Sequence, residues 1–214
     1  MIQNMKKNYL LHRFLLVLFC CFLMGCGKKN ERMETVDVGD VVEFGMSLSE
    51  NQILKWIVLE CDGDEALLLS EEIITYRRFH QNDTSIEWHS SECCTWLNND
   101  FYNEAFSEAE KDKIIECEIQ TKNYGSDTAD STPNRVFLLS TKEMNEYVKG
   151  KKYAKILIND SAIGWFLRDK AENQTHIAYV DANGDIIEGL GAEMQSEQGI
   201  RPAIRIKVNN IRQE

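Results

Sequence analysis

The order of hydrophobic and polar positions divides the chain into three parts. A continuous apolar run of 11 residues (14–24, FLLVLFCCFLM) lies near the start, and residues 27–38 are mostly polar. From Gly39 onward, apolar residues recur with the two-residue spacing of strands and the three- to four-residue spacing of helices. This stretch contains no internal repeat and no low-complexity linker. We therefore predict a polar tether over residues 26–38 and one globular domain over residues 39–210.

The first half of the predicted domain begins with strands. A short apolar segment at Val41–Phe44 is followed by a longer one at Ile53–Glu60 and by an apolar run at Glu65–Ser70. The sequence Asp-Gly-Asp at 62–64 separates the last two and has the residue types of a tight turn. We therefore predict that these two strands form a β-hairpin.

A helix is predicted next, in the sequence SECCTWLN. Ser90 or Ser91 can cap it, because a serine hydroxyl accepts a hydrogen bond from the free N–H groups at a helix start. Cys93, Trp96 and Leu97 then fall on one face, at positions i, i+3 and i+4. We expect this face to pack in the core, which argues against a nucleophilic role for Cys93.

The second half adds two helix starts and several strands. Ser107 with Glu110, and Ser140 with Glu143, have the spacing of capping boxes. Residues 123–134 are expected to form a polar loop. Strands are predicted at residues 114–120, 136–139, 164–167, 178–181, 185–188 and 200–208. Hairpins with interspersed helices indicate an α+β domain with a twisted antiparallel sheet and two or three short helices.

The first 25 residues have the features of an export signal. Lys6, Lys7 and Arg13 are basic, and no acidic residue accompanies them. The apolar run has 11 residues, whereas about 20 are needed for a helix that spans a bilayer. We therefore predict a secretory signal over residues 1–25 rather than a membrane helix.

The end of this signal resembles the lipobox of bacterial lipoproteins. The sequence LMGC at residues 23–26 carries the resemblance, which implies that Cys26 is lipidated on its sulfur and becomes the first residue of the mature chain. The lipid would then attach the protein to the outer face of the cell membrane. Ordinary cleavage after Gly27 is the alternative.

The charge of the chain disfavours nucleic acid as a partner. The 24 Lys and Arg residues and 35 Asp and Glu residues give a net charge of −11. Loss of residues 1–25 would remove three positive charges and no negative ones, which gives −14 (−11 − 3). Such a surface repels phosphate backbones. The Lys28-Lys29 pair beside the predicted anchor could rest on anionic lipid headgroups.

Four cysteines follow the predicted anchor, and several arrangements are open to them. Cys61, Cys93, Cys94 and Cys117 allow three disulfide pairings, among which Cys93 or Cys94 with Cys117 is plausible. Buried free thiols are an equal alternative. A metal site is less favoured, because the chain has no CxxC and the spacing from His89 to Cys93 is not a standard ligand pattern.

Several short motifs follow one another in an order that resembles one bacterial family. They are FG at 44–45, ILKWIVL at 53–59, ALLLS at 66–70, WHS at 88–90, WLN at 96–98, AFS at 105–107, VFLLS at 136–140, WFLR at 165–168 and GIRPA at 199–203. This order resembles domain of unknown function 6273, common in exported and surface proteins of anaerobic Gram-positive bacteria. The resemblance covers about residues 39–208 and implies no established activity. The last third is distantly similar to C-type-lectin-like and sulfatase-modifying-factor folds.

A calcium loop is one interpretation of the segment 181–185. Asp181, Asn183 and Asp185 have the spacing of calcium ligands, but Ile186 and Ala192 stand where such a loop needs glycine and glutamate. A hairpin turn at Asn-Gly explains the same residues. We therefore predict no metal and no cofactor.

Four residues are candidates for ligand binding. Arg168 and Arg201 follow apolar residues in predicted strands, where a buried guanidinium must be paired. A structural salt bridge is one role for each, and a fork that grips a carboxylate or sugar hydroxyls is the other. Trp88 and Trp165 could stack on sugar rings, whereas Trp96 is expected in the core.

These features together favour a binding protein over an enzyme. We expect a non-catalytic, lipid-anchored module that binds a cell-envelope ligand, either a glycan, a peptide or another surface protein. Loops commonly carry recognition, and the candidates are residues 123–134 and 169–175. The alternative is an extracytoplasmic enzyme with a pocket built around Arg168 and Arg201.

Overall fold

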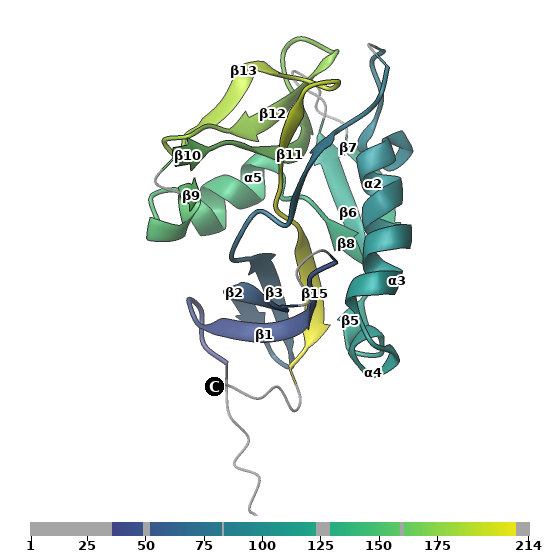
Figure 1. Cartoon of the computed structure of the whole chain (residues 1–214), viewed down its shortest axis with the longest axis vertical. Helices are drawn as coiled ribbons and strands as arrows, with labels where there is room; N and C mark the ends of the chain where they lie inside the picture. Colours follow the sequence, from purple (N-terminus) through teal and green to yellow (C-terminus); the bar gives the residue numbers. More distant parts are fainter. Residues whose placement is uncertain (1–35, 49–51, 83, 123–128, 159–160, 209–214) are drawn as a thin grey trace, which may run out of the picture. The chain divides into compact units, whose positions relative to one another are not determined.

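The computed structural model describes residues 36–48, 52–82, 84–122, 129–158 and 161–208 (Figure 1). The predicted signal, Cys26 and most of the predicted tether lie outside these residues. Val36 is already buried in the core, so the packed domain includes a residue ahead of the predicted boundary at residue 39. Among the helices described, none is both long and apolar enough to cross a membrane.

The first sheet contains the predicted hairpin. Its order is β1-β2-β3-β15-β5, β8 also pairs with β15, and all of its pairings are antiparallel. The strands are β1 (Val41–Met46), β2 (Ile53–Asp62), β3 (Glu65–Ser70), β5 (Ile114–Ile115), β8 (Val136–Phe137) and β15 (Ala203–Lys207). Asp62 pairs with Glu65 across the turn, where Gly63 has a φ of +62° that a glycine adopts without steric cost. The hairpin prediction is confirmed.

The second sheet has the order β13-β12-β11-β14-β4 and lies in the upper part of Figure 1. Its strands are β4 (Thr75–Arg78), β11 (Trp165–Lys170), β12 (His176–Val180), β13 (Ile186–Glu193) and β14 (Glu197–Ile200). β11 and β14 are parallel, joined at Trp165 and Gly199, and the other pairings are antiparallel. β4 forms one edge of this sheet and β13 forms the other.

The predicted strand over residues 200–208 is divided between the two sheets. β14 ends at Ile200 in the second sheet, and β15 begins at Ala203 in the first. Arg201 and Pro202 connect them, and a proline has no N–H to donate to a strand ladder. The yellow end of the chain in Figure 1 therefore passes from the upper sheet into the lower one.

The predicted polar loop over residues 123–134 is corrected in part. Residues 123–128 lie outside the described part of the chain, but β7 (Ala129–Asn134) pairs residue by residue with β6 (Cys117–Lys122). These polar residues form a strand because their main chain completes a ladder, which composition does not reveal. A second small ladder joins β9 (Ile156–Ile158) to β10 (Ser161–Ile163).

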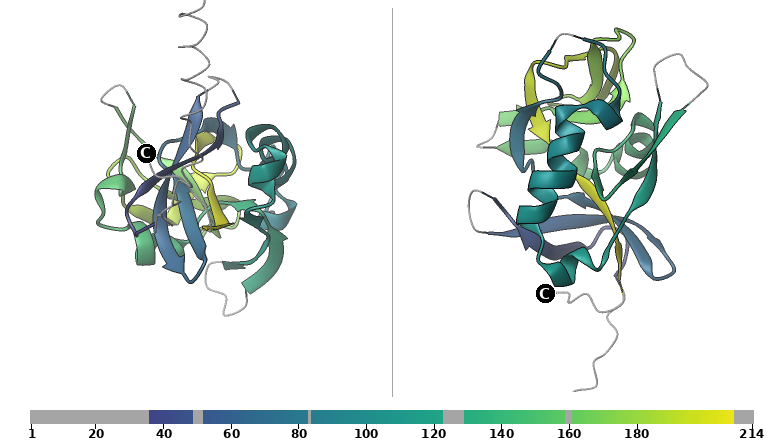
Figure 2. Two further views of the ribbon diagram at one scale, coloured as in Figure 1. Left: turned by 90° about the horizontal axis from the view of Figure 1, so that it is seen from below. Right: turned by 90° about the vertical axis from the view of Figure 1, so that its right-hand side faces the viewer.

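The predicted helix is longer than expected and packs one face in the core. A 3₁₀ turn, η1 (Trp88–Ser90), precedes α2 (Glu92–Trp96), a π-helical turn η2 (Leu97–Phe101) and α3 (Tyr102–Ala105). This helical run is seen along its length in the right-hand view of Figure 2. The Ser91 hydroxyl accepts from the Cys94 N–H, and Cys93, Trp96 and Leu97 are buried as predicted.

Both predicted capping boxes are present. Ser107 and Glu110 begin α4 (Glu108–Lys111), while Ser140 and Glu143 begin α5 (Thr141–Glu143). The π-helical turn η3 (Met144–Val148) continues α5, and a further 3₁₀ turn, η4, covers Lys152–Ala154. The prediction of a single α+β domain with mainly antiparallel strands and short helices is confirmed.

Candidate ligand pocket

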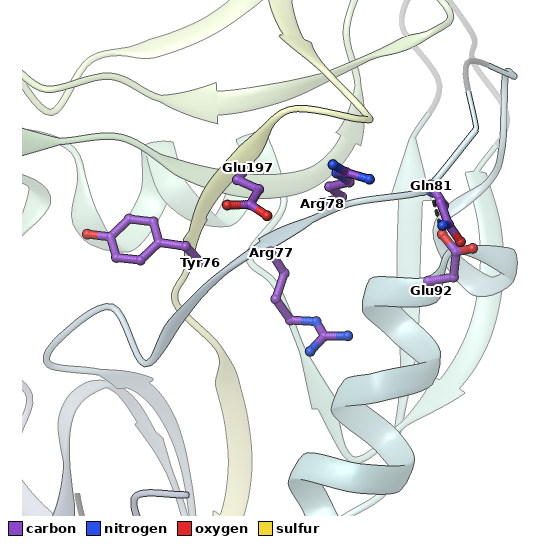
Figure 3. A pocket seen from close by; sticks show the side chains of 6 residues that line it. All are labelled: Tyr76, Arg77, Arg78, Gln81, Glu92 and Glu197. Carbon is purple, nitrogen blue, oxygen red and sulfur yellow. Dashed lines mark hydrogen bonds between the residues drawn. The ribbon is translucent and has the colours of Figure 1, made fainter. Parts of the chain in front are cut away.

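A polar pocket opens along the β4 edge of the second sheet. Its volume is about 470 Å³, within the ~300–1,000 Å³ typical of small-ligand sites. Residues of β4, of the turn after it, of α2 and of β14 line it; they are Tyr76, Arg77, Arg78, Gln81, Glu92 and Glu197 (Figure 3). Two neighbouring arginines and two glutamates therefore border one depression in a strongly acidic chain.

Pairing of β4 with β14 positions these side chains. Arg78 lies opposite Glu197, and Tyr76 lies opposite Gly199. Successive side chains of a strand point to opposite faces, so Arg77 and Arg78 project to the two sides of the edge, as Figure 3 shows. Tyr76 is 43% exposed and stands at the end of the pocket away from α2.

The guanidinium of Arg77 is held by an aromatic ring rather than by a carboxylate. Its central carbon lies 4.4 Å from the centre of the Trp96 ring, and Trp96 is fixed in the core. Stacking occupies a face of the guanidinium and leaves its N–H groups, which lie in the plane, free to donate. Within the described part of the chain, neither Arg77 nor Arg78 has a carboxylate at ion-pair distance.

Glu92 is bound to its own chain. Its Oε2 accepts a hydrogen bond from the Gln81 main-chain N–H at 2.5 Å and lies 2.7 Å from Nδ1 of His80. The His80 nitrogen is close but is not aligned for a hydrogen bond. Glu92 thus closes one end of the pocket while the two arginines remain available to a ligand.

Trp88 and Trp165, the two tryptophans named as candidates for stacking on sugar rings, are buried. Trp88 donates its indole N–H to Oδ1 of Asn134 at 2.7 Å. Trp165 is completely covered, and the guanidinium of Arg201 lies 5.1 Å from its ring centre. Neither ring presents a face to solvent, so neither is accessible to a sugar in this structure.

Arg168 and Arg201, the two arginines named as candidates for ligand binding, are buried and paired within the fold. Arg168 forms an ion pair with Glu143 and also donates to the carbonyl oxygens of Leu138 and Gln120, so the salt-bridge interpretation holds for it. Arg168 and Arg201 lie outside the pocket, as do Trp88 and Trp165. A ligand-gripping role would need each guanidinium to leave its present partners.

Arg201 is held by main-chain oxygens instead of the expected carboxylate. It donates to the carbonyl oxygens of Ser70 (2.9 Å), Tyr153 (2.7 Å) and Glu71 (3.3 Å). Burial lowers the pKa of its guanidinium to about 9, which still leaves the group charged at neutral pH. Arg201 therefore fixes the junction between the two sheets.

The four cysteines in the described part of the chain, Cys61, Cys93, Cys94 and Cys117, are free thiols. Cys93 and Cys94 are buried, Cys117 is half-buried and Cys61 is exposed. Burial raises the pKa of the Cys94 thiol to about 11 and raises that of Cys93 further. The free-thiol alternative is thus the one observed, and neither buried thiol is ionised at neutral pH.

The segment 181–185 forms the expected hairpin turn. Oδ1 of Asp181 accepts hydrogen bonds from the main-chain N–H groups of Asn183 (2.8 Å) and Asp185 (2.9 Å). Gly184 has a φ of +86° at the end of this turn. In the described residues, no three His, Cys, Asp or Glu side chains are grouped so as to hold a metal ion.

The family described as domain of unknown function (DUF6273) matches residues 63–208, and the chain belongs to it. No curated protein and no solved structure matches the chain. The distant similarity to C-type-lectin-like folds stays a prediction.

The pocket residues were missed by the sequence analysis. β4 has only four residues, and their sequence, Thr-Tyr-Arg-Arg, has no alternation of apolar and polar side chains. One signal was available: two adjacent arginines, preceded by a tyrosine, in a chain with a net charge of −11.

Proposed function

We propose that this chain is a bacterial lipoprotein whose domain is a non-catalytic binding or assembly module for a cell-envelope ligand on the outer face of the membrane. The ligand class is a glycan, a peptide or another surface protein. The LMGC sequence ahead of a polar segment supports the anchor, and family membership supports a shared domain without assigning it a reaction.

The observation that carries the binding role is the pair of arginines in the pocket. Arg77 is fixed on Trp96, and neither it nor Arg78 has an ion-pair partner in the described part of the chain. A guanidinium that is held in place with free N–H donors is preorganised for an acceptor on a ligand. A preorganised group loses less conformational entropy on binding.

The enzyme alternative placed Arg168 and Arg201 in a pocket. Their guanidinium groups donate instead to Glu143 and to main-chain carbonyl oxygens inside the fold. No observation therefore favours that alternative over the binding module.

Capture from the cell envelope tests the proposal. The full-length chain, purified in detergent, would be incubated with cell-wall fragments and with envelope lysate. The double variant Arg77→Gln/Arg78→Gln is the test variant, and Arg135→Gln is the matched control because Arg135 pairs with Glu116 outside the pocket.

We expect the wild type and the Arg135 control to enrich the same component, and the double variant to lose it. Equal enrichment by all three proteins would contradict the proposed site. Turnover of a glycan or peptide substrate without stable capture would contradict the binding role.

A further inference from the structure

The main chain of β4 has one side without a strand partner. The Ile74 N–H donates to the Ile200 carbonyl at 2.9 Å and the His80 N–H donates to the Met194 carbonyl at 3.0 Å, so these residues face the β14 side. The Phe79 carbonyl instead accepts from the Cys93 N–H at 3.2 Å, on the α2 side.

Residues of an extended chain alternate in the side to which their N–H and C=O point. Ile74, Phe79 and His80 flank the strand, so the orientation within β4 follows from its pairing with β14. The Gly199 N–H donates to the Gly164 carbonyl at 3.2 Å, on the β11 side, so Gly199 turns its main-chain groups away from β4. Its partner Tyr76, and Arg78 two residues further on, therefore direct both groups away from β14. Within the described residues, β4 pairs with no strand other than β14. α2 closes the edge at Phe79, so the free stretch is β4 itself.

The pocket lies along this free edge, and of its two arginines and two glutamates the arginines, which have no ion-pair partner in the described residues, offer donors to a ligand. Arg77 and Arg78 project to opposite faces of the edge and hold open donors (Figure 3). An incoming strand likewise alternates its side chains. Two successive acidic residues on that strand would each reach one arginine.

We propose that an extended peptide with two successive acidic residues adds to the free edge of β4 as a strand. Its main chain pairs with Tyr76 and Arg78, and its carboxylates bind the guanidinium groups of Arg77 and Arg78. Strand addition gives affinity through the main chain and specificity through the side chains. This inference rests on the proposed binding function of the same pocket and names its ligand class.

A labelled peptide tests the inference directly. The probe is fluorescein-labelled Thr-Val-Glu-Glu-Val-Thr with blocked ends, titrated with the full-length chain in detergent and followed by fluorescence anisotropy. One control peptide has Gln-Gln in place of Glu-Glu. A second control keeps both glutamates but carries N-methyl groups on alternate amides, which prevents strand pairing.

We expect the Glu-Glu peptide to bind and the Gln-Gln peptide to bind at least about tenfold more weakly, since a charge-assisted hydrogen bond contributes more than the ~1.4 kcal/mol that equals a factor of ten. Arg77→Gln and Arg78→Gln should each weaken binding about tenfold for the same reason. The N-methylated peptide should also bind at least about tenfold more weakly, because it loses several main-chain hydrogen bonds at once. Arg135→Gln should bind as the wild type does.

Equal binding of the N-methylated peptide would overturn strand addition, and equal binding of the Gln-Gln peptide would overturn carboxylate recognition. No binding of any peptide would overturn the whole inference. If a uronic-acid oligosaccharide bound instead, in an Arg77-dependent manner, the peptide ligand would be wrong. Envelope capture that depends on the two arginines would then still support the proposed function.

Discussion

Arg168 and Glu143 form a forked ion pair that joins a strand to a helix start. Nη1 of Arg168 lies 2.5 Å from Oε2 of Glu143, and Nη2 lies 3.0 Å from Oε1. The same Glu143 carboxylate accepts the Ser140 N–H at 2.8 Å in the capping box of α5. The pair thus connects β11 to the start of α5, so both residues have a structural role.

Loss of one partner of this pair should be costly. Arg168 is 2% exposed, so Arg168→Met leaves a carboxylate largely shielded from water and should lower the free energy of unfolding by about 3–5 kcal/mol. Arg135→Met removes a surface pair with Glu116, whose side chains are about half exposed, and should cost only about 0–1 kcal/mol. Urea unfolding of the two variants measures the difference. Equal losses of unfolding free energy in the two variants would show that the buried pair stabilises the fold no more than the surface pair does.

The same pair should make stability depend on acid pH. Burial alone would raise the pKa of Glu143, but the charge of Arg168 and hydrogen bonds from Arg168 and Ser140 outweigh it and hold the pKa below the ordinary 4.5. A carboxyl whose pKa is lower in the folded state stabilises the fold above its unfolded pKa. That stabilisation is lost as pH falls below 4.5 through the lower folded pKa.

Unfolding free energies of the wild type and Glu143→Gln between pH 7 and pH 3 check this sign. We expect the wild type's advantage to be constant above about pH 5 and to shrink below it. An advantage that does not change over the whole range would contradict the lowered pKa of Glu143.

The parts of the fold that sequence could predict are those set by near neighbours. The Ser140–Glu143 box and the turn at Gly63 depend on hydrogen bonds and dihedral angles within four residues. The burial of Cys93 follows from the period of one helix face. Each of these features was confirmed because little outside the local segment can override it.

The parts that could not be predicted depend on distant partners. β4 forms because Tyr76 pairs with Gly199 in the second sheet. The sequence around either residue does not indicate this pairing. The pocket is therefore invisible until the chain has folded. Arg201 was expected to pair with a carboxylate because sequence shows charge, whereas the fold supplies three carbonyl oxygens at the junction of its sheets.

Two glycines with nearly the same φ allow the cost of backbone strain to be distinguished from the cost of close packing. Gly63 and Gly191 have φ values of +62° and +63°, but a Cβ on Gly63 would meet no atom within 4 Å. A Cβ on Gly191 would overlap the Cβ of Ala171 and lie 2.8 Å from the Ile177 carbonyl oxygen.

Gly63→Ala should cost about 1–2 kcal/mol for the left-handed backbone alone. Gly191→Ala should cost that amount plus about 1–3 kcal/mol for overpacking. Thermal or urea unfolding would compare them, and equal losses would show that the contact at Gly191 relaxes freely.

The predicted anchor can be tested by metabolic labelling. Cells that express the wild type, Cys26→Ala or Cys21→Ala would be fed an alkyne fatty acid, and the protein would be isolated and its label measured. The LMGC sequence predicts strong labelling of the wild type and of Cys21→Ala, because only Cys26 is expected to carry lipid. Equal labelling of Cys26→Ala would rule out this anchor.

Photocrosslinking in cells tests the central claim most directly, namely that the β4 edge is where the ligand binds. A photoreactive phenylalanine would replace Tyr76 in the pocket or, as a control, Leu190 on β13, which is 83% exposed at the opposite edge of the same sheet. We predict a discrete crosslinked product from position 76, absent from position 190 and lost when Arg77→Gln and Arg78→Gln are added. The same products from both positions, or none from position 76, would contradict the account.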